Sequence, residues 1–311
     1  MPPPILCLTG AHGRSRLGRY CITSPTPGAH MPKAIYFAHL HKAGGSSMCR
    51  MAEANGLRIT PRDAFNCRPY SAKDRRILYN GTRSMQCTTL QNLSQHYDFI
   101  ANEAGLPDDL CFDEHITYVT VVRSPAARYL SYYLQVAALL RHGYMVPEYY
   151  YAHALRKQYG YPKVLQPPPF DAFLNHSSAN NGFIDNAMTR FFAGQFARAK
   201  RGEPLGEPEL QRAMCNLRRF DVVLSLETDF TPAMLGTVLG WQKMARGGTT
   251  HNSNEKLASL PSATRSLLDA KTVLDQRLYE FARQLRNTSH APVNCTPSNA
   301  LGPLTIDHHG S

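Results

Sequence analysis

A lysine followed by a run of small residues is the first place in this chain where residue types and spacing indicate chemistry. The run is Lys42, Ala43, Gly44, Gly45, Ser46 and Ser47. Glycines let backbone N–H groups approach an anion closely, and the helix expected to follow adds about half a positive charge at its N-terminus. The lysine supplies a full charge. The pattern therefore predicts a phosphate-binding loop, with a plain strand-to-helix turn as the alternative.

The common phosphate loop of nucleotide hydrolases has the form GxxxxGK[ST], in which the lysine follows the glycines. Here Lys42 precedes them, and the GxxxxGK[ST] pattern occurs nowhere in the sequence. A nucleotide kinase or hydrolase is therefore disfavoured, and detection of phosphate release from ATP would revive it.

A second candidate anion site follows residues 116–122, a β-branched run that is typical of a buried parallel strand. Ser124 suits the position before a helix and Pro125 suits its first position, so Arg123 is expected where the strand gives way to a helix. Ser131 lies within that helix. The alternative is that Arg123 pairs with a carboxylate and Ser131 is simply exposed.

The elements that must position these residues alternate along the chain. Strands are expected at residues 35–38, 98–101, 116–122 and 221–226, and helices at 128–141, 208–219, 233–239 and 263–285. This alternation predicts an α/β fold with a mainly parallel sheet covered by helices on both faces. Ligands bind such sheets at the carboxyl ends of the strands, where both candidate loops are expected.

The two loops together resemble a known family. Residues 41–47, HKAGGSS, resemble the 5′-phosphosulfate loop of sulfotransferases that use 3′-phosphoadenosine-5′-phosphosulfate, and residues 121–133, VVRSPAARYLSYY, resemble their 3′-phosphate motif. The resemblance implies a three-layer P-loop-like domain in which Lys42 stabilises the leaving 5′-phosphate and residues 43–47 cradle it. It also implies that Arg123 and Ser131 hold the 3′-phosphate. The nucleotide is then the sulfate donor, and the transfer requires no metal.

Three weaker similarities point to the carbohydrate, Golgi-type branch of that family. They are residues 185–194 (DNAMTRFFAG), 220–227 (FDVVLSLE) and 274–281 (LDQRLYEF), so the resemblance spans residues 33–286. By likeness to related enzymes, Arg190 contacts the nucleotide phosphate or an acidic acceptor. A position on the surface of a helix is the alternative for Arg190.

The acceptor hydroxyl needs a base to take its proton. In the family this base, His or Glu by branch, follows a strand roughly twenty residues before the 3′-phosphate arginine, and Glu103 stands at that spacing before Arg123. Glu103 is therefore the first choice. The rivals are His96, His39 and His41, because the pKa of histidine is better matched to neutral pH.

The resemblance implies a sulfotransferase that moves a sulfuryl group to a hydroxyl of a carbohydrate or glycoprotein acceptor by in-line displacement. Tyrosine on a secreted protein is a rival acceptor. A catalytically silent module that binds anionic glycan through a basic cleft is the alternative from another class. The tyrosine-rich stretch at residues 142–170 is expected either to form a loop over the site or to pack as a helix on the edge of the core.

Composition favours one large domain with an anionic partner. The chain has 311 residues, of which 43% are hydrophobic, and a net charge of +11. The predicted domain covers residues 32–287, between disordered segments at 1–31 and 288–311. The positive charge fits a nucleotide or an acidic polysaccharide as well as general solubility. Because the basic residues are scattered and form no nucleic-acid tract, no nucleic-acid partner is expected.

Cysteines and glycosylation sequons bear on the compartment. Eight cysteines without a CxxC pair argue against a metal site, and Cys67, Cys87 and Cys111 could staple a loop near the site in an oxidising compartment. Five N-x-S/T sequons favour the secretory lumen, and they begin at Asn80, Asn92, Asn175, Asn287 and Asn294. The resemblance implies a Golgi protein with an N-terminal membrane anchor, but no stretch of this chain has the apolar length of a signal peptide or anchor.

Overall fold

The computed structural model describes residues 5–8, 20–23, 33–60, 87–103, 106, 112–141, 167–175, 185–194, 204–244 and 257–285. The chain divides into two units, Met1–Lys33 and Ala34–Ser311. In the first unit, strands β1 (Ile5–Leu8) and β2 (Tyr20–Thr23) pair in antiparallel register, with Cys7 opposite Cys21. Apart from these two strands, the segments predicted to be disordered lie outside the described residues.

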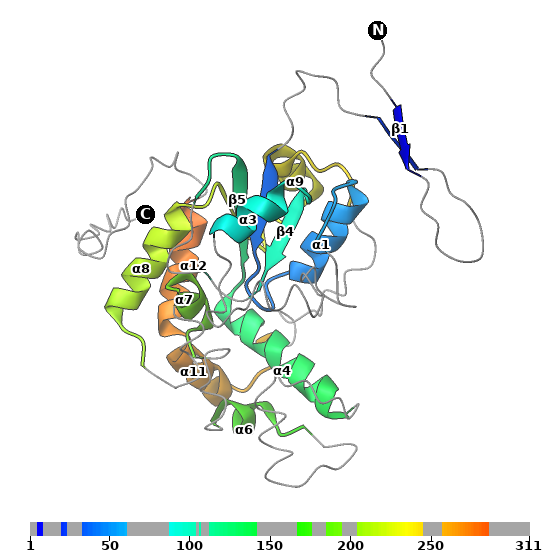
Figure 1. Cartoon of the computed structure of the whole chain (residues 1–311). Helices are drawn as coiled ribbons and strands as arrows, with labels where there is room; N and C mark the ends of the chain where they lie inside the picture. Colours follow the sequence, from blue (N-terminus) through cyan, green and yellow to red (C-terminus); the bar gives the residue numbers. More distant parts are fainter. Residues whose placement is uncertain are drawn as a thin grey trace. The chain divides into compact units, whose positions relative to one another are not determined.

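The second unit contains a four-stranded sheet in which all strands are parallel (Figure 1). Its strands are β3 (Ala34–Ala38), β4 (Phe99–Asn102), β5 (Ile116–Val122) and β6 (Val222–Ser225), and their order in the sheet is β4-β3-β5-β6. The prediction of an α/β fold with a parallel sheet is confirmed. The two central strands are β3 and β5, so the loops that follow them emerge next to each other at one edge of the sheet.

Nine helices are described in the second unit, and the labels follow Figure 1. They are α1 (Gly45–Ala54), α3 (Cys87–Ser94), α4 (Pro125–Arg141), α6 (Phe170–Asn175), α7 (Ala187–Phe192), α8 (Glu207–Arg218), α9 (Pro232–Leu239), α11 (Ser262–Lys271) and α12 (Val273–Leu285). Within the described ranges, none of these helices combines the length and the apolar character needed to cross a membrane.

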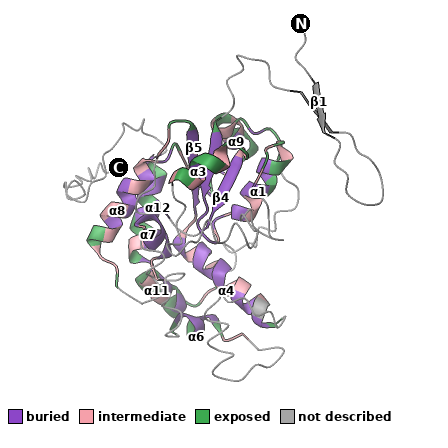
Figure 2. Ribbon diagram, in the orientation of Figure 1, coloured by how far each residue is buried: buried purple, intermediate pink, exposed green. Residues whose placement is uncertain are grey.

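Helices pack against both faces of the sheet, because successive strand residues point to opposite sides. Tyr36 and Ala38 of β3 belong to a buried cluster with residues of α7, α8 and α12, whereas Ile35 and Phe37 belong to one with residues of α1 and α9. A third cluster joins α4, α6 and α11 through aromatic and leucine side chains. Most residues of the four parallel strands are buried in Figure 2, and β3 and β4 are buried throughout, as expected for a sheet covered on two sides.

The single helix predicted at residues 263–285 is wrong in one respect, because the structure divides it at Thr272 into α11 and α12. The Thr272 hydroxyl donates to the carbonyl of Leu268 (3.0 Å), and the Asn186 side chain accepts from the N–H groups of Leu274 (2.9 Å) and Asp275 (3.1 Å). A side chain from a distant segment therefore caps a new helix N-terminus in the middle of a continuous helical pattern.

Candidate functional site

The loop between β3 and α1 holds its lysine in an unusual backbone conformation. Lys42 has a φ angle of 67° and Gly44 one of 85°, both in the left-handed region. Among the described residues, Lys42 and Asn186 are the only non-glycine residues with positive φ. For a residue with a side chain this conformation costs on the order of 1 to 3 kcal/mol, and it is found most often at functional sites.

Close approach to His39 requires glycine at position 45, and the positive φ angle favours glycine at position 44. A Cβ atom on Gly45 would lie 1.7 Å from Nε2 of His39, and one on Gly44 would lie 2.8 Å from Cδ1 of Leu226. The backbone therefore lies directly against the imidazole on one side and against the residue that follows β6 on the other. The first turn of α1, which begins at Gly45, contains no acidic residue and has no side-chain cap.

Arg123, which follows β5, joins the two candidate loops. Its Nη1 donates to the backbone carbonyl oxygen of Lys42 at 3.0 Å. Burial, together with the positive charge of Arg123, lowers the pKa of Lys42 to about 8. Because this pKa still lies above 7, the lysine is mostly protonated at neutral pH. Two cations held together at the carboxyl ends of adjacent strands form a site suited to an anion.

Ser131 and the serines of α1 lie in the helices that begin at this edge. Ser131 is 5% exposed in α4, so the alternative of a simply exposed serine is wrong. The alternative that Arg123 pairs with a carboxylate holds in part, because its Nε lies 3.9 Å from a carboxylate oxygen of Glu227. Ser46 and Ser47 occupy the first turn of α1, whereas Ala43 is fully buried and offers the loop only its backbone.

Three of the four candidates for the general base come together in space. Oε1 of Glu103, at the end of β4, lies 3.7 Å from Nε2 of His39 and 3.9 Å from Nε2 of His41. All three residues are buried. His96 lies apart from them, exposed in the turn that follows α3. These residues were alternative bases in the sequence analysis. In the structure, Glu103, His39 and His41 form one cluster, in which the carboxylate lies between the two imidazoles.

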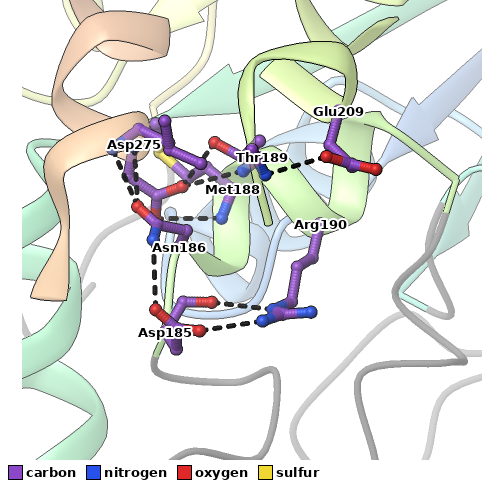
Figure 3. Close-up of polar contacts among 9 residues, drawn as sticks. Asp185, Asn186, Met188, Thr189, Arg190, Glu209 and Asp275 are labelled. Atoms are coloured by element: carbon purple, nitrogen blue, oxygen red, sulfur yellow. Dashed lines mark hydrogen bonds and ion pairs between the residues drawn. The ribbon is translucent and has the colours of Figure 1, made fainter. Parts of the chain in front are cut away.

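Arg190 is buried, at 1% exposure, so the surface alternative for this residue is wrong. Its Nε donates to the backbone carbonyl of Asp185 (2.9 Å) and its Nη2 to the Asp185 carboxylate (2.8 Å), as Figure 3 shows. These contacts fix the entry into α7. The backbone of Phe191, the next residue, accepts from the N–H of Leu106 (3.4 Å), so α7 lies beside the segment that follows Glu103.

One carboxylate at this edge was missed by the sequence analysis. Glu227, after β6, accepts a hydrogen bond from the backbone N–H of Ser124 (3.1 Å) and one from the hydroxyl of Tyr279 (3.1 Å). Its position directly after a predicted strand could have identified Glu227 from the sequence. The carboxyl end of every strand in a parallel sheet faces the same edge, so the end of β6 adjoins the loop that follows β5.

Three of the described cysteines, Cys49, Cys87 and Cys215, are disulfide-bonded, whereas Cys67 and Cys111 lie outside the described residues. In the parts of the chain that the structure describes, no group of three or more His, Cys, Asp or Glu side chains is arranged to hold a metal ion. Most of the tyrosine-rich stretch at residues 142–170 also lies outside the described ranges.

No protein-family model matches this chain, and no curated protein matches its sequence.

Proposed function

We propose that this protein is a sulfotransferase that moves a sulfuryl group from 3′-phosphoadenosine-5′-phosphosulfate to a hydroxyl of a carbohydrate or glycoprotein, in a P-loop-like domain. The observation that carries the proposal is the contact between Arg123 and the carbonyl of Lys42 (3.0 Å). It brings together the two loops whose sequences resemble the phosphosulfate loop and the 3′-phosphate motif. A nucleotide with phosphates at both ends requires two such anion sites side by side.

In the proposed reaction the acceptor oxygen attacks the sulfur atom, and the bond between sulfur and the bridging phosphate oxygen breaks. Lys42 neutralises the charge that develops on the leaving 5′-phosphate, and the backbone N–H groups and hydroxyls of residues 43–47 cradle it. Arg123 and Ser131 hold the 3′-phosphate, so that the sulfur is aimed in line with the acceptor. The products are a sulfate ester and adenosine 3′,5′-bisphosphate.

Glu103 takes the proton of the acceptor hydroxyl in this proposal. Its position between His39 and His41 (3.7 and 3.9 Å) supports the assignment, because both imidazoles can share the proton with the carboxylate and pass it on. Glu103→Gln is then expected to lose turnover while it retains nucleotide binding. Unchanged turnover in this variant would remove Glu103 as the base.

The proposed compartment is the Golgi lumen, and two observations support it. Disulfide bonds at Cys49, Cys87 and Cys215 are typical of oxidising compartments. Among the sequon asparagines, Asn92 and Asn175 are exposed in the structure, whereas Asn80, Asn287 and Asn294 lie outside the described residues.

The test is incubation of the full chain with labelled donor against a panel of glycans and tyrosine peptides. Lys42→Ala is expected to lose transfer by at least about 100-fold, the effect of removing one group that stabilises the developing charge. Lys243→Ala is the matched control, because Lys243 is an exposed lysine. Near-normal transfer by Lys42→Ala would overturn the mechanism.

The same panel tests the acceptor and the class. Transfer to tyrosine peptides alone would replace the carbohydrate acceptor. The absence of transfer to every acceptor, with glycan binding retained, would replace the enzyme by a binding module.

A further inference from the structure

The turn that follows β6 contacts both candidate anion loops with two consecutive residues. The N–H of Leu226 donates to the carbonyl of Val122 (2.9 Å), which extends the pairing of β6 with β5 toward Arg123. The side chain of Leu226 lies against Gly44, so closely that a Cβ there would be 2.8 Å from Cδ1. Glu227, the next residue, faces the second loop. This turn therefore adjoins both candidate anion loops.

The Glu227 carboxylate is held by hydrogen bonds on both oxygens. Oε1 accepts from the backbone N–H of Ser124 (3.1 Å) and lies 3.9 Å from Nε of Arg123. Oε2 accepts from the hydroxyls of Tyr279 (3.1 Å) and Ser225 (3.2 Å). Three hydrogen-bond donors, from Ser124, Ser225 and Tyr279, thus hold the carboxylate before any ligand arrives. Its position is therefore set by partners from three different segments of the fold.

The Glu227 carboxylate forms an ion pair with the guanidinium of Arg123. The side chains of Arg123 and Glu227 are 12% and 19% exposed, so water screens their attraction only in part. Burial lowers the pKa of Arg123, the nearby charge of Arg128 acts in the same direction, and Glu227 opposes both. Nη1 donates a hydrogen bond to the carbonyl of Lys42, whereas Nε lies 3.9 Å from Glu227, at ion-pair distance and beyond hydrogen-bond range.

We infer that Glu227 is a positioning residue that holds the guanidinium of Arg123 in the plane required to receive the 3′-phosphate of the nucleotide. This inference rests on the proposed function. Glu227 does not touch the ligand, and as an anion it repels a nearby phosphate. Its contribution to binding therefore comes through the orientation of Arg123, which must outweigh that repulsion. Orientation of Arg123 strengthens phosphate binding and repulsion weakens it, so a substitution that removes the charge of Glu227 shows which effect is larger.

The experiment measures the affinity of the full chain for adenosine 3′,5′-bisphosphate and for adenosine 5′-monophosphate by isothermal titration calorimetry. The ratio of the two dissociation constants reports what the 3′-phosphate contributes. Glu227→Gln and Glu227→Ala are expected to lower the affinity for the bisphosphate about tenfold and to change that for the monophosphate less than about twofold. Tyr279→Phe removes one anchor of Glu227 and is expected to act in the same direction, more weakly. Glu114→Gln, at an 88% exposed side chain, is the matched control.

A double-mutant cycle shows whether Glu227 acts through Arg123. In an Arg123→Ala background, Glu227→Gln is expected to leave the ratio unchanged. A loss of the same size in that background would overturn the inference. So would tighter binding of the bisphosphate by Glu227→Gln, because repulsion would then be the larger effect.

The failure of the inference differs from that of the proposed function. If the wild-type chain prefers the bisphosphate and Glu227→Gln, Glu227→Ala and Tyr279→Phe keep that preference, the inference alone fails. If the wild-type chain binds the bisphosphate no better than the monophosphate, the proposed function fails and the inference fails with it.

Discussion

At the junction of α7 and α12 charge is buried within a dense set of hydrogen bonds, whereas the loops that follow β3 and β5 bring two cations together in a partly open site. Asp275 is fully buried and accepts from the N–H groups of Met188 (3.0 Å) and Thr189 (2.8 Å) and from the hydroxyl of Thr189 (3.0 Å). Asn186 in turn accepts from the first N–H groups of α12. Each helix thus caps the other, as Figure 3 shows.

The candidate site is organised on the opposite plan. Lys42 has a positive φ angle, as Asn186 of the α7–α12 junction also has, but its neighbour in space is another cation, Arg123. The site compensates this repulsion only in part, through Glu227. In the proposed function, the anionic nucleotide supplies the negative charge that this arrangement lacks.

Both regions resemble motifs of one family, but their polar and charged residues are paired differently. Residues 185–194 and 274–281 are far apart in the sequence, yet they meet in the reciprocal caps of α7 and α12. Their polar residues satisfy each other and stabilise the fold. The loop residues Lys42 and Arg123 do not neutralise each other. We therefore expect the pairing of charges, and not resemblance alone, to distinguish a binding motif from a structural one.

The largest expected effect is on stability, at Asp275. Asp275→Ala removes the cap of α7 and the negative charge that attracts the buried Arg128, so it is expected to lower the free energy of unfolding by about 3–5 kcal/mol. Asp275→Asn keeps an acceptor for the cap and is expected to cost less. Urea denaturation of the purified chain measures both. A loss below about 1 kcal/mol for the alanine variant would remove the distinction between the two regions.

An intermediate effect is expected in the pH dependence of nucleotide binding. The pKa of Lys42 is about 8 in the free protein, and a bound phosphate raises it, because an anion favours the charged lysine. Affinity is therefore highest below pH 8 and falls by up to about tenfold per pH unit above it, until the pKa of the complex is reached.

Titration with adenosine 3′,5′-bisphosphate between about pH 6.5 and 9.5 measures this slope. Lys42→Arg keeps its charge over the whole range, so the fall is expected to disappear in that variant. An equal fall in wild type and variant would assign the titration to another group.

The smallest effect is expected at an exposed ion pair near the α7–α12 junction. Nη1 of Arg277 in α12 lies 2.7 Å from a carboxylate oxygen of Glu207 in α8, and both side chains are about half exposed, at 48% and 49%. Solvent screens such pairs, so Arg277→Ala is expected to change the free energy of unfolding by less than about 1 kcal/mol. The same urea denaturation measures it. A cost as large as that of Asp275→Ala would show that burial is not what separates these interactions.

Local pattern was sufficient for the strands and for the first residues of both loops. The apolar run before Lys42 and the β-branched run before Arg123 are buried strands of a parallel sheet, because such runs fit a sheet that is covered on both faces. Strand ends then locate the loops. Local pattern failed at Thr272, where the helix break depends on Asn186 in a distant segment.

The sequence by itself determined the α/β class, the two loops and a short set of candidate bases, because these depend on residue type and on spacing along one segment. Tertiary structure decided which of those residues meet. It placed Glu103 between His39 and His41, set Arg123 on the carbonyl of Lys42 and brought Glu227 to Arg123. The physical reason is that hydrogen bonds and ion pairs act over a few ångströms in space, and only the order of strands in the sheet brings distant segments within that range.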